Sequence, residues 1–263
     1  MRLRAKLAFG IAFVVILTLS QTAWAAAQGG TLPGLPWPRS GAGSAASPGS
    51  MPGSMPGSMP WTIVVLLTLL TLLPALLLSM TPFVRLLVVF HFLRQALGTQ
   101  TTPSNQTLIG LALILTYFLM QPVGAAIEVQ AIQPLQQGRI NVWQAIELGS
   151  APVRQYMLRY AREKDLALFV ELAHEPRPRN PADVPMRVVA PAYLLSELKA
   201  GFQIGAVLFL PFLVIDVVVA AITTSIGMVQ LPPIVISTPL KILLFVLVDG
   251  WNLLIGSVMR SFS

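Results

Sequence analysis

The sequence predicts an all-α membrane protein whose helices form hairpins and are broken at prolines. Of its 263 residues, 55% are hydrophobic and only 10% are charged, whereas about a quarter of the residues in an average soluble domain are charged. The charges are also clustered, because 15 of the 27 lie between Glu128 and Arg187. The rest of the chain is nearly free of charge, as expected of helices that face lipid or the inside of a protein.

Residues 1–25 predict a cleavable signal peptide. Three basic residues lie within the first six positions, a short apolar core follows, and Ala23 and Ala25 place small residues before a cleavage site. An uncleaved first transmembrane helix is the alternative, but an apolar core of about 13 residues is short for a bilayer. Residues 26–60 are rich in Gly, Pro and Ser and contain three Pro-Gly-Ser-Met units, which predicts a disordered linker.

Residues 61–127 predict an N-terminal membrane helical hairpin. Its first apolar run contains Pro74, where we expect a kink or a break. The second run is Thr107–Ile127. Arg85 and Arg94 fall between the two runs, so the sequence places both in a polar connecting loop that faces the cytoplasm.

Residues 128–189 form the only segment with a soluble composition, and we expect it to be a periplasmic helical segment. Ser150 is a plausible N-cap, with Pro152 in the first turn. The apolar positions that follow share one helix face: Val153, Tyr156, Met157, Tyr160 and Ala161. Leu168, Phe169 and Leu172 are expected to continue the buried side of the same helix.

Residues 190–263 predict a C-terminal helical hairpin, with Pro211 interrupting its first helix. Asp216, Lys241 and Asp249 lie in apolar surroundings, where a charge is costly unless it is paired. We interpret Lys241 as the partner of one of the two aspartates, in an ion pair that fixes register. A proton relay through these residues is the alternative.

Several classes of chemistry are disfavoured. The chain has no cysteine, so disulfides and thiolate sites are excluded. His91 and His174 have no partners at metal-ligand spacing, and no Gly-rich phosphate loop is present. The charged segment is close to neutral and has no basic stripe for nucleic acid. An intramembrane hydrolase built on Asp216 and Asp249 stays as a minor alternative, and we expect no enzyme activity and no cofactor.

Long strings of residues carry a resemblance to a known family. They include Leu72–Thr81, Pro103–Leu113, Arg162–Phe169, Phe209–Asp216 and Val248–Asn252, and the match extends over roughly residues 61–263. In these strings the chain resembles the FliP family of flagellar export-gate proteins, called SctR in injectisomes. The signal peptide and the periplasmic segment favour the flagellar branch.

The resemblance implies a structural role in protein export. Several copies would assemble with two smaller membrane proteins, of the FliQ and FliR type, into a helical oligomeric complex in the flagellar basal body. That complex would pass unfolded flagellar subunits across the bacterial inner membrane. An independent ion or small-molecule channel is the alternative function.

The resemblance also assigns roles to particular residues. A constriction loop would comprise Met228, Val229 and Gln230, where family members carry consecutive methionines and this chain keeps only the first. Subunit contacts would involve Tyr156, Phe169, Glu197 and Lys241.

Overall fold

The computed structural model describes residues 61–99, 101–176, 180, 183–227 and 232–262. The signal peptide and the linker predicted over residues 1–60 lie outside these ranges. By its internal contacts the chain divides into two units, residues 1–76 and residues 77–263. Helix α2 carries the described part of the first unit, and the remaining helices belong to the second.

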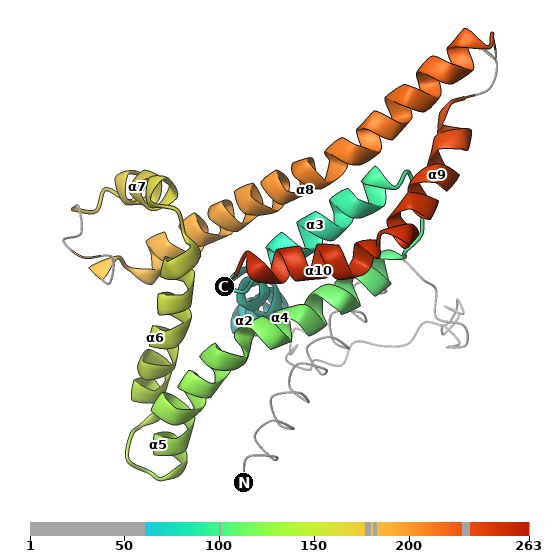
Figure 1. Cartoon of the computed structure of the whole chain (residues 1–263). Coiled ribbons are helices and arrows are strands. Elements are labelled where there is room, and N and C mark those ends of the chain that lie inside the picture. Colours follow the sequence, from blue (N-terminus) through green and yellow to red (C-terminus); the bar gives the residue numbers. More distant parts are fainter. Residues whose placement is uncertain (1–60, 100, 177–179, 181–182, 228–231, 263) are drawn as a thin grey trace, which may run out of the picture. The chain divides into compact units, whose positions relative to one another are not determined.

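All the regular secondary structure in the described part of the chain is helical and no strand occurs there, which confirms the predicted all-α class. The helices are α2 (Trp61–Ser79), α3 (Phe83–Ala96), α4 (Asn105–Ile127), α5 (Gln133–Gln136), α6 (Val142–Tyr160), α7 (Glu163–Leu172), α8 (Met186–Ser225), α9 (Ile234–Leu247) and α10 (Gly250–Arg260). A π-helical turn, η1 (Glu128–Ile132), joins α4 to α5. Figure 1 labels these helices.

The helices are not broken at Pro74 or Pro211, because both residues lie inside continuous helices. The kink expected as the alternative at Pro74 stays a prediction. Other prolines stand where helices begin, since Pro82, Pro185 and Pro233 are the N-caps of α3, α8 and α9. The position fits the chemistry, because the first turn of a helix needs no N–H donor and suits the fixed φ angle of proline.

The loop predicted around Arg85 and Arg94 is also wrong, because both arginines lie in α3. Five apolar side chains of this helix are completely buried: Leu86, Val89, Phe90, Leu93 and Ala96. Together they form one apolar stripe with helical spacing. Ending the predicted helix at the first charged residue after an apolar run therefore leaves α3 unpredicted.

The N-cap of α6 lies nine residues before the predicted N-cap at Ser150. Asn141 caps the helix, because its side chain accepts a hydrogen bond from the backbone N–H of Gln144, and the Gln144 side chain accepts one from the N–H of Asn141. This reciprocal pair is a capping box. Ser150 and Pro152 lie inside the helix.

The helix predicted to run on through Leu172 is instead two helices, because the backbone becomes extended at Ala161 and Arg162. The apolar face predicted for α6 does pack in a buried cluster around Met157 and Tyr193. In α7, however, Leu168 and Leu172 are exposed, and the residues that are buried are Asp165 and Val170.

Helix α8 packs along α3, and two glycines allow the close approach. A Cβ atom at Gly201 would lie 3.0 Å from Val88, and one at Gly205 would lie 2.5 Å from the ring of Phe92. Small residues at this spacing let helix backbones come together. The main apolar core forms where these two helices meet α4, α9 and α10 (Figure 1).

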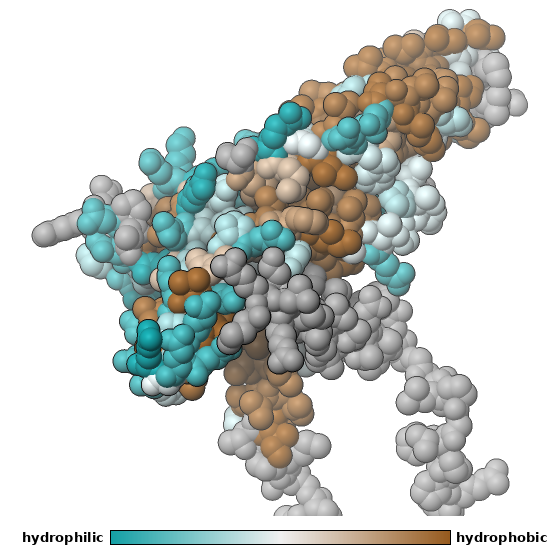
Figure 2. Space-filling view, turned by 60° about the horizontal axis from the view of Figure 1, so that its bottom comes forward, coloured by the Kyte–Doolittle hydropathy of each residue, from teal (hydrophilic) through white to brown (hydrophobic). Residues whose placement is uncertain are grey.

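Within the described residues, two helical segments are long and apolar enough to cross a membrane: Asn105–Gln136 and Met186–Ser225. The count rises to four if each of two bent helix pairs is taken as one span. Figure 2 shows apolar surface gathered over the distal ends of α8 and α9, whereas hydrophilic surface gathers over α6 and α7. The second unit is thus apolar at one end and polar at the other.

Candidate functional site

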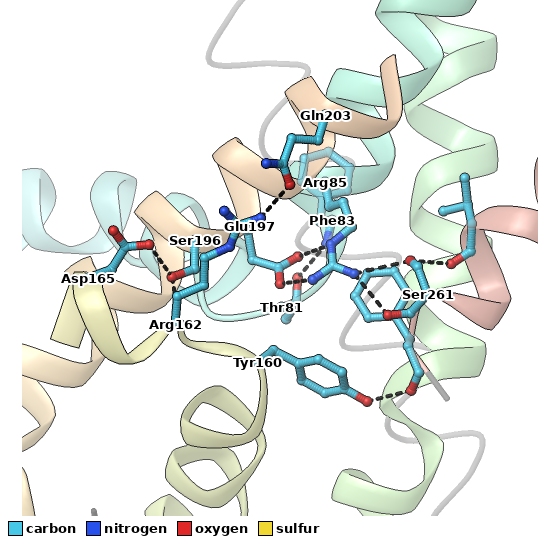
Figure 3. Close-up of polar contacts among 12 residues, drawn as sticks. Thr81, Phe83, Arg85, Tyr160, Arg162, Asp165, Ser196, Glu197, Gln203 and Ser261 are labelled. Carbon is cyan, nitrogen blue, oxygen red and sulfur yellow. Dashed lines mark hydrogen bonds and ion pairs between the residues drawn. The ribbon is translucent and has the colours of Figure 1, made fainter. Parts of the chain in front are cut away.

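A buried arginine lies where four helices meet. Arg85 of α3 is 5% exposed, and its Nε donates to Glu197 Oε2 of α8 at 3.0 Å, while Nη2 donates to Oε1. Glu197 is completely buried. Two parallel charge-assisted bonds of this kind fix both position and orientation (Figure 3).

The other side of the same guanidinium group binds the end of α10. Arg85 Nη1 donates to the carbonyl oxygen of Ser261 at 3.2 Å and to its hydroxyl at 3.1 Å. The guanidinium carbon lies 3.9 Å from the centre of the Phe262 ring, which is a cation–π contact. Tyr160 of α6 donates its hydroxyl to the carbonyl of Phe262. Arg85 therefore joins α3, α8 and α10, and Tyr160 adds α6.

A second polar network begins one residue away on α8. Ser196 donates to Asp165 of α7 at 2.7 Å and accepts a bond from the backbone N–H of Arg162 at 2.9 Å. Lys199 also donates to Asp165. Burial raises the pKa of Asp165, but the hydrogen bonds from Lys199 and Ser196 outweigh burial and hold it below its ordinary value of 3.8. The ionised carboxylate therefore ties α7 to α8.

A third charged pair lies in the apolar hairpin. Lys241 Nζ of α9 donates to Asp216 Oδ2 of α8 at 2.6 Å. Lys241 is 2% exposed, whereas the side chain of Asp216 is 36% exposed. The structure thus pairs Lys241 with one of the two aspartates that the sequence allowed. The other, Asp249, has a left-handed backbone and precedes α10.

The four residues for which the resemblance implied subunit contacts also make contacts within their own chain, and the subunit contacts themselves stay predictions. Tyr156 and Phe169 pack in the cluster around Met157, and Glu197 and Lys241 have their partners in the same chain. Burial first, and then the negative charge of Glu197, raise the pKa of Tyr156 above its ordinary value of 10. The constriction loop predicted over residues 228–230 lies outside the described residues.

Sequence reasoning missed Arg85, Asp165 and the Ser261–Phe262 segment. A signal for Arg85 existed, because the rule that singles out charges in apolar surroundings applies to it as well as to Asp216. No pattern in the sequence marked Phe262. The role of these groups is to hold helices together. Among the described residues, no cluster of three His, Asp or Glu side chains could hold a metal ion.

Comparison with known proteins extends over most of the chain. A family model described as the FliP family matches residues 66–258. The flagellar biosynthetic protein FliP of Pectobacterium carotovorum is 54% identical over 198 residues, which cover 75% of this chain and 77% of that protein. The Bacillus subtilis protein of the same name is 46% identical over 200 residues, covering 76% of this chain and 90% of the relative.

A longer relative of the same name, from Buchnera aphidicola, is 50% identical over 199 residues, covering 76% of this chain and 52% of that protein. The family model's match includes the helices that carry Arg85, Glu197, Asp216 and Lys241. The chain therefore belongs to the FliP family.

Proposed function

We propose that this chain is a structural and pore-forming subunit of the flagellar type III export gate, through which unfolded flagellar subunits cross the inner membrane. The observation that carries the proposal is the FliP family match over residues 66–258. The relatives are named for flagellar biosynthesis, and a role in flagellar export follows from the family. The pore-forming role is the further step of the proposal.

The surface of the C-terminal hairpin supports assembly with other chains. Large apolar side chains stand exposed along both of its helices, including Val207, Leu210, Val214 and Val217 on α8 and Val235, Leu243 and Val246 on α9. A soluble monomer does not expose an apolar surface of this extent. We propose that copies of the same chain and two smaller gate proteins, of the FliQ and FliR type, cover much of it.

The constriction loop over Met228, Val229 and Gln230 is part of the same proposal. A methionine side chain repacks easily around an object of variable shape. Tyr156, Phe169 and Glu197 would support subunit contacts indirectly, because in the single chain they hold α6, α7 and α3 against α8. The surface that these helices present to a neighbour then depends on them.

Location is proposed on the same grounds. The chain would be a multi-pass inner-membrane protein of the flagellar basal body, its signal peptide removed, with residues 128–189 on the periplasmic side. The polar surface over α6 and α7 (Figure 2) suits an aqueous compartment.

The test is native mass spectrometry of the chain, co-expressed with the two small gate proteins of its own bacterium, alongside motility of a deletion strain. We expect a discrete complex with several copies of this chain, and a deletion strain that regains motility only with the intact gene. A lone monomer in the presence of both intact partners would contradict the proposal. Ionic currents from the purified chain alone would instead support the channel alternative.

A further inference from the structure

Helices α9 and α10 form one bent pair, and the bend has an identifiable backbone origin. The axes of Ile234–Leu247 and Gly250–Arg260 differ by 69°. Asp249 lies between them with φ 51° and ψ 52°, a left-handed conformation that is unfavourable for most residues with a Cβ atom, although aspartate adopts it more readily than most. A continuous helix through this point would relieve that conformation and regain backbone hydrogen bonds. The bend must therefore be held by other contacts.

Near the bend, Gly250 packs under an aromatic ring. A Cβ atom at this position would lie 2.2 Å from Cδ2 of Phe245. Trp251 packs edge-on against the same ring, with centroids 5.6 Å apart. These contacts are compatible with the bent form. Because they lie next to the bend, they do little to fix the position of the far end of α10.

Leu254 and Val258 of α10 are buried in the main apolar core. The far end of the helix is held by the Ser261–Phe262 segment, which we name the C-terminal latch. Ser261 accepts two hydrogen bonds from Arg85. The ring of Phe262, 6% exposed, lies against the guanidinium group of Arg85 and packs edge-on with Tyr160 at 5.6 Å. The Phe262 carbonyl accepts the hydroxyl of Tyr160. Arg85 is itself held in place by its ion pair with Glu197, so the C-terminal latch binds a fixed side chain.

We propose that α10 is a two-state element: the C-terminal latch holds it bent at Asp249, and release of the latch lets α10 swing into line with α9. The left-handed backbone of Asp249 favours the straight form. The contacts of Phe262 and the core packing of Leu254 and Val258 favour the bent form, so release of the latch must also take these two side chains out of the core. Lys241 anchors α9 to α8, so the movement is confined to α10.

The experiment measures a distance between spin labels in the full-length chain in lipid nanodiscs. The sequence has no cysteine, so V235C and S257C, both at exposed positions, give a unique labelled pair. From a helical rise of about 1.5 Å per residue, straightening a 69° bend lengthens this distance by about 5 Å. We expect one short distance in the otherwise unchanged chain.

Phe262→Ala should add a population at the longer distance, and Tyr160→Phe, which removes only the hydroxyl, should add a smaller one. Leu253→Ala is the matched control, because it truncates a 58% exposed side chain on the same helix and should leave the distance unchanged. Adding Asp249→Gly to Phe262→Ala should return the short distance, since glycine adopts the left-handed conformation without strain.

Rescue by the glycine variant distinguishes release from unfolding, because an unfolded α10 would not recover the short distance. An unchanged single distance in both Phe262→Ala and the Phe262→Ala/Tyr160→Phe double variant would overturn the proposal. A longer distance in Leu253→Ala as well would also overturn it, by showing that truncation anywhere on α10 moves the helix.

Discussion

At the scale of single residues, the fold depends on a few charges and glycines at places where helices come closest. Arg85 and Glu197 lie far apart in sequence yet make a bidentate pair in the interior. Removing one partner of a buried pair leaves the other charge buried without a counter-charge. The free-energy cost of this is much larger than the stability that an exposed ion pair contributes. The sequence identifies such charges as important, but the choice of partner depends on how the helices fold together.

Gly205 offers a direct test of the α3–α8 contact. We expect Gly205→Ala to lower the free energy of unfolding by about 1–3 kcal/mol, because its Cβ atom would overlap the Cβ atom and ring of Phe92. Gly110→Ala is the control, because nothing lies within 4 Å of a Cβ there. It should be neutral or mildly stabilising. Thermal unfolding in detergent measures both variants, and equal stability of the two would contradict the contact.

Asp165 should make the α7–α8 contact sensitive to acid. Its pKa is lowered in the folded chain, so its stabilising effect is complete above its ordinary value of 3.8 and is lost as the pH falls through the lower, folded-state pKa. We expect Asp165→Asn to lower stability by about 1–3 kcal/mol at neutral pH, because Lys199 and Ser196 lose an ionised acceptor.

The difference between wild type and Asp165→Asn should then shrink below pH 4, since a protonated aspartate resembles asparagine in charge. Thermal unfolding from pH 7 to pH 3 measures it. A difference that stays constant over this range would show that the charge of Asp165 does not hold α7.

At the scale of helices, the sequence predicted the class and several long elements, but it misplaced their ends. The apolar run predicted to start at Thr107 corresponds to α4, whose N-cap is Ser104. Proline was the misleading signal, because Pro74 and Pro211 are accommodated inside helices. Local chemistry at helix starts was the more informative signal. The Asn141–Gln144 spacing is a readable capping box, and reading it would have placed α6 correctly.

The capping box predicts a local effect. Asn141→Ala should cost about 1 kcal/mol, because the N–H of Gln144 loses its acceptor. Amide hydrogen exchange should become faster over the first turn of α6 and stay unchanged at its C-terminal end. Asn141→Ser, which keeps a capping oxygen, should recover most of the protection. Uniformly faster exchange along the whole helix would contradict a purely local cap.

At the scale of the whole molecule, long matching strings give the family, and composition gives a membrane protein with a charged middle segment. Neither reveals that α3 lies in the core, that α10 turns away from α9, or that the last residues cover Arg85. These features arise from contacts between segments more than a hundred residues apart, and helical periodicity carries no information about such contacts. The candidate site was therefore only partly predictable: Asp216 and Lys241 were identified, whereas Arg85, Asp165 and Phe262 were not.

Variants of Lys241 and Asp216 test whether this ion pair forms within one chain or between neighbouring copies. In the structure both partners belong to one chain. Lys241→Glu alone should destabilise by about 3–5 kcal/mol, because it places two carboxylates together in an apolar hairpin. Asp216→Lys alone should be similarly harmful, and the exchange of both charges within one chain should restore most accumulation and motility.

Co-expression of the two single variants on separate chains distinguishes the two arrangements. If the pair forms within each chain, the mixture has two like charges in every hairpin, and neither assembly on native mass spectrometry nor motility should recover. If the pair forms between copies, as the family resemblance implied for Lys241, complementary chains would restore both. We expect no recovery, because the observed pair leaves Lys241 2% exposed within a single chain and so out of reach of a neighbour.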